Sequence, residues 1–220
     1  MSKEGRKNNS FFRRCVRGMD FVSRQLLGIA EFDASEECLL RIGSLHLDRE
    51  IALADGVILR RGDRALEVHL WNEHLAILKG SGTLRWANTA RRRFEYSFAR
   101  LAAYIEQKPE LGDVRALMMK PAFTRRQRRR NLQRLPRLIR GAWTAVPRRL
   151  NAIERVHAVI DDAWLWLLSR AFNPFDAPKL GFLRHRQEFW ISREGFLARF
   201  GGGGAARPRR EAVTALPPRT

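Results

Sequence analysis

Residues 64–71 hold the side chains best suited to chemistry. Glu67 and His69 share one face of a predicted strand, because alternate residues of a strand point the same way. A carboxylate and an imidazole in that position can move protons, so we name Glu67 and His69 as candidate catalytic general-base residues. His46, in a neighbouring predicted strand, is expected to face them. A histidine with only a structural hydrogen bond is the alternative. His74 lies five residues beyond His69, which is not a zinc-protease spacing, and we predict no metal site.

A second candidate site lies just before a predicted helix at about 83–107. The loop is Gly80-Ser81-Gly82-Thr83. Two glycines ahead of a helix can present successive backbone N–H groups, and the helix dipole adds positive potential. We therefore name these four residues as a candidate site for a phosphate-bearing cofactor. An ordinary connecting loop is the alternative.

The third candidate is a cluster of arginines in residues 121–150. This segment contains ten arginines and no acidic residue, in a chain whose net charge is +19. Arginine suits phosphate geometry, so the segment is expected to bind an anion. A solvated face balanced by the acidic residues of 31–73 is the alternative. The residues that we name as anion-binding are Arg125, Arg126, Arg129, Arg130, Arg134, Arg137 and Arg140.

Residues 10–27 predict a basic amphipathic helix. Phe12, Val16, Met19, Val22 and Leu26 recur at spacings of three and four, with arginines on the other sides. The spacing predicts either a helix docked on the domain by this stripe or a helix lying on a membrane surface.

The elements that must position these residues form one α+β domain. Strands are expected at 38–47, 57–60 and 64–71 as a three-strand meander, followed by the helix at 83–107 and a strand at 113–119. The inward side of the 83–107 helix is expected to be Leu84, Ala87, Phe94, Phe98, Leu101 and Ile105. These predict a mixed, mainly antiparallel sheet with helices packed on it.

The second half is predicted to be mostly helical. A helix kinked at Pro136 and ended by Pro147 is expected in residues 121–150. Another follows at about 150–171. A strand at 182–191 and a helix at 193–200 capped by Ser192 complete the domain. The inward side of the 150–171 helix is expected to be Ile153, Val156, Ile160, Trp164, Leu167 and Ala171.

Three segments therefore organise the chain: a helix in 1–28, a domain in 29–200 and a disordered tail in 201–220. Cys15 and Cys38 have no metal-ligand spacing and are too few to staple the domain. No apolar run is long enough to span a membrane. We expect a cytoplasmic protein, with peripheral association at the inner membrane surface as a further expectation.

A further set of residues forms a recognisable pattern: Gly62-Asp63, Glu67, His69-Leu70, Asn72-Glu73, Leu180-Gly181-Phe182 and Trp190-Ile191-Ser192-Arg193-Glu194. Together they resemble the YkoP-like family, a bacterial domain sometimes attached to polysaccharide deacetylases. The resemblance covers about 35–200, and the family supplies no activity to carry over.

The order of elements is similar to that of GNAT acyltransferases. In that family an arginine or glutamine, two residues and a Gly-x-Gly or Gly-x-Ala loop hold the pyrophosphate of coenzyme A. Gly80 and Gly82 match the pattern, but Ile77 stands where arginine or glutamine belongs, and the arginine-rich segment 121–150 is a second departure. The resemblance implies the fold and puts the cofactor site in doubt.

Three functions follow from these observations. The favoured one is a non-catalytic accessory or binding domain, without a cofactor, on an anionic membrane surface or an acidic protein or polymer. The alternative is an acyltransferase that uses coenzyme A, with Glu67 or His69 as general base. The third is nonspecific nucleic-acid binding, because no sequence-reading motif accompanies the arginines.

Overall fold

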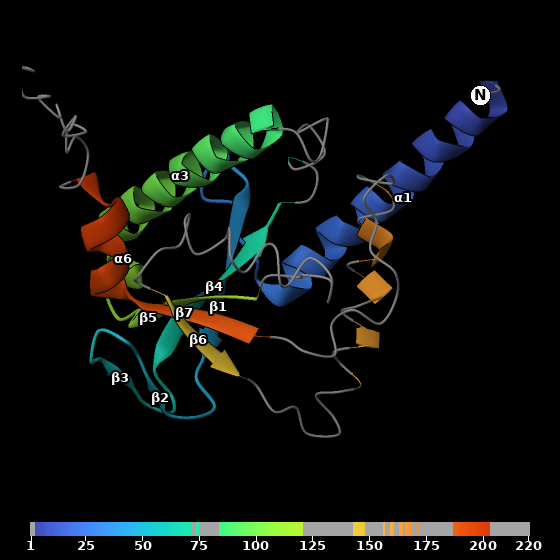
Figure 1. Cartoon of the computed structure of the whole chain (residues 1–220). Helices are drawn as coiled ribbons and strands as arrows, with labels where there is room; N and C mark the ends of the chain where they lie inside the picture. The colour runs from blue at the N-terminus through green and yellow to red at the C-terminus, as the bar shows by residue number, and fades with distance from the viewer. Residues whose placement is uncertain are drawn as a thin grey trace, which may run out of the picture.

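The computed structural model describes residues 3–71, 74, 84–120, 143–147 and 187–202, with helical positions 156, 159, 160, 163, 164, 166–168 and 171. Within these residues the chain has three long or medium helices, a short 3₁₀ turn and seven strands (Figure 1). In chain order they are α1 (Lys3–Leu27), β1 (Leu40–His46), β2 (Ile51–Ala52), β3 (Ile58–Leu59), β4 (Arg64–Leu70), α3 (Leu84–Gln107), η1 (Pro109–Leu111), β5 (Ala116–Met119), β6 (Thr144–Pro147), β7 (Gln187–Ser192) and α6 (Arg193–Phe200).

A five-stranded sheet in the order β1-β4-β5-β7-β6 forms the frame of the domain. Only β4 and β5 are parallel neighbours, and α3 lies between them in the chain. The other neighbouring pairs are antiparallel. The predicted α+β class and the mixed, mainly antiparallel sheet are therefore confirmed.

The predicted three-strand meander is wrong in its pairing. β1 pairs directly with β4 over seven residues each, from Leu40 opposite Leu70 to His46 opposite Arg64. The segment between them folds into the separate two-stranded sheet of β2 and β3. The long alternating strands can exchange far more hydrogen bonds with each other than either can with the two-residue β3. Gly56, at φ +86°, supplies the turn inside that small hairpin.

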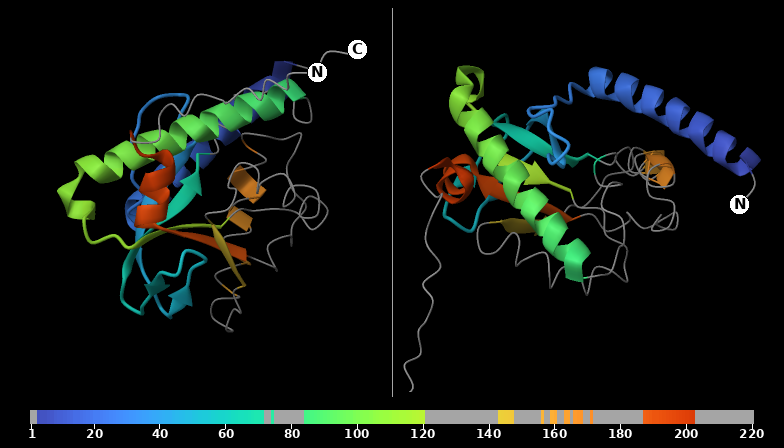
Figure 2. Two further views of the ribbon diagram at one scale, coloured as in Figure 1. Left: turned by 60° about the vertical axis from the view of Figure 1, so that its left-hand side comes forward. Right: turned by 90° about the horizontal axis from the view of Figure 1, so that it is seen from above.

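One face of the sheet is covered by α3 and α6 (Figure 2). Phe98 of α3 is 1% exposed at the centre of this core and contacts the rings of Phe94, Trp143, Phe196 and Phe200. Leu66 and Val68 of β4 face the same core, as the alternation of the strand predicts. The predicted inward residues of α3 that are described, Phe94, Phe98, Leu101 and Ile105, all lie in or against this core.

The opposite face of the sheet is apolar only where the β2–β3 hairpin covers it. There Ala65, Ala116, Met118 and Trp190 pack with residues of the hairpin. Ser192 links the β2–β3 hairpin to α6. Its hydroxyl donates to Asp55 at 2.5 Å and accepts from the backbone N–H of Gly195 at 2.9 Å. The predicted cap of the last helix is thus confirmed.

The helix predicted through residues 121–150 is wrong at its end. Residues 144–147 form β6, an edge strand paired with β7 from Thr144 opposite Trp190 to Pro147 opposite Gln187. A threonine and a valine fit a strand, and an edge position tolerates a proline. The rest of that segment, residues 121–142 and 148–150, lies outside the described residues.

Phe98→Ala is expected to lower the free energy of unfolding by about 3–5 kcal/mol, because it removes the ring at the centre of the core and leaves a cavity. Phe21→Ala is the matched control. Phe21 is 54% exposed on α1, so its truncation should change stability by less than about 0.5 kcal/mol. Urea denaturation of both variants measures the difference, and equal losses would contradict the placement of the core.

Candidate functional site

Helix α1 presents apolar side chains to solvent. Met19, Val22 and Leu26 belong to the stripe for which docking on the domain is one of two predictions, and they are 52, 54 and 82% exposed. Together with exposed Cys15 they recur at spacings of four, three and four and so lie along one side of the helix. Val16 is the described member of the predicted stripe that is buried, so docking by that stripe is wrong. We call Cys15, Met19, Val22 and Leu26 the outer stripe.

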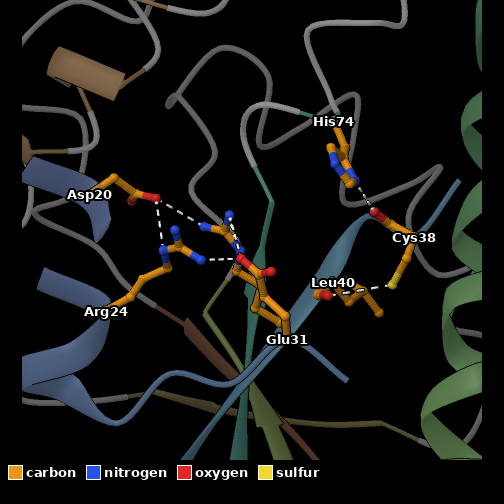
Figure 3. Close-up of polar contacts among 7 residues, drawn as sticks. Asp20, Arg24, Glu31, Cys38, Leu40 and His74 are labelled. Atoms are coloured by element: carbon orange, nitrogen blue, oxygen red, sulfur yellow. Dashed lines mark hydrogen bonds and ion pairs between the residues drawn. The ribbon is translucent and has the colours of Figure 1, made fainter. Parts of the chain in front are cut away.

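The side of α1 that faces the sheet is charged instead. Asp20 is 8% exposed, and its carboxylate lies 3.0 Å from Nη1 of Arg41 on β1 and 3.2 Å from Nε of Arg24. Glu31, which follows the helix, also pairs with both arginines (Figure 3). These four residues, Asp20, Arg24, Glu31 and Arg41, form the charge cluster. It contains two positive and two negative groups.

Arg41 is the most buried member of the charge cluster, at 4% exposure near the start of β1. Its guanidinium also lies over the ring of Trp71 at 4.1 Å, a favourable cation–π distance. Burial, and then the charge of Arg24, lower the pKa of Arg41, while Asp20 and Glu31 oppose that shift. Arginine stays charged at neutral pH even so, and a buried charge without counter-ions is very costly.

Hydrogen bonding to Arg41 is incomplete. The contact of Nη2 with Glu31 is an ion pair at 3.1 Å without hydrogen-bond alignment, and Nε has no hydrogen-bond partner. The N–H of the Trp71 indole is likewise buried without an acceptor. Arg41 therefore depends on its two carboxylates for compensation more than a fully hydrogen-bonded arginine would.

The chain after α1 is fixed to the sheet independently of the helix. Gly28, at φ +62°, ends α1 with the backbone N–H of Ile29 donating to the carbonyl of Arg24 at 2.9 Å, the Schellman pattern that favours glycine. Ala30 then exchanges two backbone hydrogen bonds with Ile42, at 2.7 and 3.0 Å. This places Glu31 beside β1.

The ring of Trp71 also contacts a histidine. It stacks on the imidazole of His74 at 3.8 Å, with the planes 14° apart. Nδ1 of His74 lies 2.6 Å from the carbonyl oxygen of Cys38 (Figure 3). Because a carbonyl only accepts, Nδ1 must carry the proton, which leaves Nε2 as the unprotonated nitrogen of the neutral ring. His74 thus ties the end of β4 to the start of β1.

The predicted general-base residues do lie together on one sheet face. Glu67 forms an ion pair with Lys120, at 3.0 Å between Oε1 and Nζ, and both side chains are about three-quarters buried. His69 is half-buried and directly opposite Arg41. Its ring lies over Gly43, where an added Cβ would be 3.2 Å from Nε2. Their catalytic role stays a prediction.

His46 does not join this group. It lies opposite Arg64 at the far end of β1, because the antiparallel register puts it five residues from the level of His69. The predicted cofactor loop, Gly80 to Thr83, lies outside the described residues, as do the seven arginines from Arg125 to Arg140.

A second helical segment lies beside α1. Leu168 and Ala171 are buried against Val16, with Trp164 and Leu167 packed around them. Val156 and Ile160, predicted to face inward, are instead exposed, and so is Val159. The exposed apolar side chains of the segment therefore lie towards its N-terminal end, and its later residues pack on α1, beside which the segment lies (Figure 1).

The charge cluster was missed at the sequence level, although two signals point to it. Arg41 interrupts the apolar run from Cys38 to Ile42, and an arginine there needs a buried partner. Asp20 is the lone acidic residue in residues 5–30, within a strongly basic helix. Nothing in the spacing shows that these two residues, far apart in the chain, would meet.

The comparisons identify the family. The family model of the YkoP domain matches residues 9–129, more than half of the 220 residues. The chain belongs to the YkoP domain family. No curated protein and no solved structure matches it. The similarity to GNAT acyltransferases is therefore not confirmed.

The match of the YkoP domain includes most of α1 and the strands up to β5. The charge cluster, Glu67 and His69 all lie inside it. The later residues that carried the resemblance, from Leu180 to Phe182 and from Trp190 to Glu194, lie beyond it. None of the helices in the described part of the chain is long and apolar enough to cross a membrane.

The chain between α1 and β1 is also held to α3, through the carboxylate of Asp33. Asp33 accepts from Nε of Arg100 at 2.6 Å, from the N–H of Ser35 at 2.8 Å and from the hydroxyl of Tyr96 at 3.3 Å. Burial raises the pKa of Asp33, but the hydrogen bonds and the charge of Arg100 outweigh it, so the pKa lies below its ordinary 3.8.

Asp33→Asn is expected to lower the free energy of unfolding by about 1–3 kcal/mol at pH 7, because the donors around it lose a charged acceptor. A depressed carboxyl pKa stabilises the fold above its ordinary value of 3.8 and loses that contribution as the pH falls through the folded-state pKa. The difference between wild type and Asp33→Asn should therefore shrink below about pH 4.

Urea denaturation at pH 7 and pH 3 measures this effect. Asp113→Asn is the control, because Asp113 is 64% exposed in its ion pair with Arg64 and should matter little at either pH. A stability loss for Asp33→Asn that is the same at both pH values would contradict the assignment.

Proposed function

We propose that this YkoP domain is an accessory domain that docks on an anionic membrane surface through α1 and the adjacent helical segment. One observation carries the proposal. Among the described residues, eight of the ten exposed large apolar side chains belong to these two helical segments. They are Met19, Phe21, Val22, Leu26, Leu27, Val156, Val159 and Ile160. An exposed apolar patch of this kind is typical of an interaction site.

The charge of α1 supports an anionic partner. The helix contains seven basic and two acidic residues. Asp20 is turned towards the sheet, while Arg14 and Arg17 are exposed. Arginines beside an apolar stripe are typical of helices that lie in the plane of a bilayer, with the stripe among acyl chains and the guanidinium groups at the phosphates.

A membrane fits these features better than the other predicted partners. Nucleic acid or an acidic polymer would contact the arginines and would leave the outer stripe in water. A bilayer accommodates both. The arginine-rich residues 121–150, with Arg125 and Arg126 at their start, would add attraction to the same surface. The coenzyme A alternative depends on the loop Gly80 to Thr83, and no described contact favours it.

Flotation with lipid vesicles tests the proposal. The full chain should float with vesicles that contain about one-third phosphatidylserine and should remain behind with pure phosphatidylcholine, because charge and apolar insertion act together. Equal recovery with both lipids, or recovery with neither, would refute it. A duplex DNA added as competitor reveals nucleic-acid binding, whose affinity should fall steeply with salt.

Leu26→Asp is expected to weaken partitioning into anionic vesicles at least tenfold. Transferring a leucine from water is worth about 1.5–3 kcal/mol, and about 1.4 kcal/mol corresponds to a factor of ten. Ile58→Asp on β3 is the matched control, because Ile58 is 54% exposed and the change of charge is identical. A vesicle titration of the two variants decides: equal weakening would mean that net charge alone matters.

A further inference from the structure

The two sides of α1 compete for the same position on the domain. An isolated amphipathic helix beside a protein normally turns its apolar side inward. Here the side with Asp20 and Arg24 faces β1, and the outer stripe faces solvent. In the described residues no side chain of α1 enters either apolar cluster of the sheet. Val16 packs on Leu168 and Ala171 of the adjacent helical segment, not on the sheet. The side that α1 turns to the sheet therefore needs a cause other than apolar packing against the sheet.

Arg41 supplies that cause. Its guanidinium is buried in β1. Without Asp20, its remaining carboxylate partner would be Glu31, which forms an ion pair with it but no aligned hydrogen bond. Asp20 adds the aligned hydrogen bond, at 3.0 Å. A helix that turned its outer stripe inward would take Asp20 away and leave Arg41 buried with one poor partner. Because an undercompensated buried charge is unfavourable, the charged side of α1 is kept against the sheet.

The end of α1 permits the other orientation. Gly28 has a left-handed backbone conformation, and nothing lies within 4 Å of the position that its Cβ would occupy. The fixed chain begins at Ala30, which is bonded to Ile42. Ile29 stands between them, with its half-buried side chain near Gly43. The backbone at Gly28 can therefore change while Ile29 stays in place, and the helix can re-dock when the requirement of Arg41 is removed.

We infer that Arg41 is a positioning residue for membrane docking: its buried charge holds Asp20 against the sheet and thereby keeps the outer stripe exposed. The membrane-docking part of this role rests on the proposed function, and the exposure of the outer stripe has its cause inside the domain. Removing the buried charge should hide a surface that Arg41 does not itself touch, while the domain stays folded.

Cys15 reports the orientation of α1 directly. It belongs to the outer stripe and is exposed, whereas Cys38 is buried, so a thiol reagent should modify Cys15 of the native protein first. In Arg41→Leu the helix is expected to turn its stripe inward, and modification of Cys15 should slow at least tenfold. Arg41→Lys keeps a buried positive charge that needs Asp20, so its rate should stay within about twofold of wild type.

Two further variants complete the test. Arg64→Leu removes an arginine of β4 that pairs with Asp113 at 2.8 Å, so it matches the charge change without touching the cluster. Its Cys15 should react as in wild type. Asp20→Asn weakens the same link from the helix side without changing the size of the side chain, and should slow Cys15 several-fold even if Arg41→Leu does not fold.

The outcomes separate this inference from the proposed function. Slow Cys15 modification in Arg41→Leu or Asp20→Asn, with circular dichroism like that of wild type, supports the positioning role whether or not the wild type floats. If the wild type floats with anionic vesicles, the slowed variant should also lose at least tenfold in vesicle affinity. Wild-type reactivity of Cys15 in Asp20→Asn and in folded Arg41→Leu would overturn the inference and leave the docking proposal standing.

Discussion

A single buried guanidinium determines how the N-terminal part of this domain is arranged. Arg41 occupies a position of β1 where the neighbouring residues are apolar and almost fully buried. It takes Trp71 as an aromatic neighbour and requires carboxylates within about 3 Å. One carboxylate comes from the fixed linker and the other from α1. The side that α1 turns to the sheet thus follows from the compensation of one charge, while Val16 packs the same helix on Leu168 and Ala171. The carboxylates offset the cost of removing Arg41 from water.

The same constraint explains why α1 differs from α3. Both helices are amphipathic, but α3 buries Phe98 and Leu101 against the sheet at 0–1% exposure. Its orientation follows from apolar area, as for most helices of globular domains. On α1 the apolar side chains of the outer stripe face solvent instead of the sheet. A helix with an ionic inner side and an apolar outer side is unfavourable in water alone, and it becomes favourable when an apolar medium meets the outer side.

Patterns within one element were predicted from the sequence, and relations between elements were not. The alternation of β4 identified which side chains face the core, and the period of α3 identified Phe98 and Ile105. Both depend on periodicity in the local chain. The pairing of β1 with β4 and the meeting of Asp20 with Arg41 depend on which distant segments come together. Local periodicity contains no information about that choice.

The apolar stripe of α1 could be predicted from the sequence, but the direction in which it faces could not. A stripe at helical spacing indicates that a helix has an apolar side, but the pattern is the same whether that side meets a protein core or a lipid surface. What distinguishes the two is the other side of the helix. There Asp20 would be an ordinary solvated residue if Arg41 were leucine. With arginine in the strand, burying the aspartate is favourable and the apolar stripe is left for a partner, so a residue of the sheet decides what the helix offers to its surroundings.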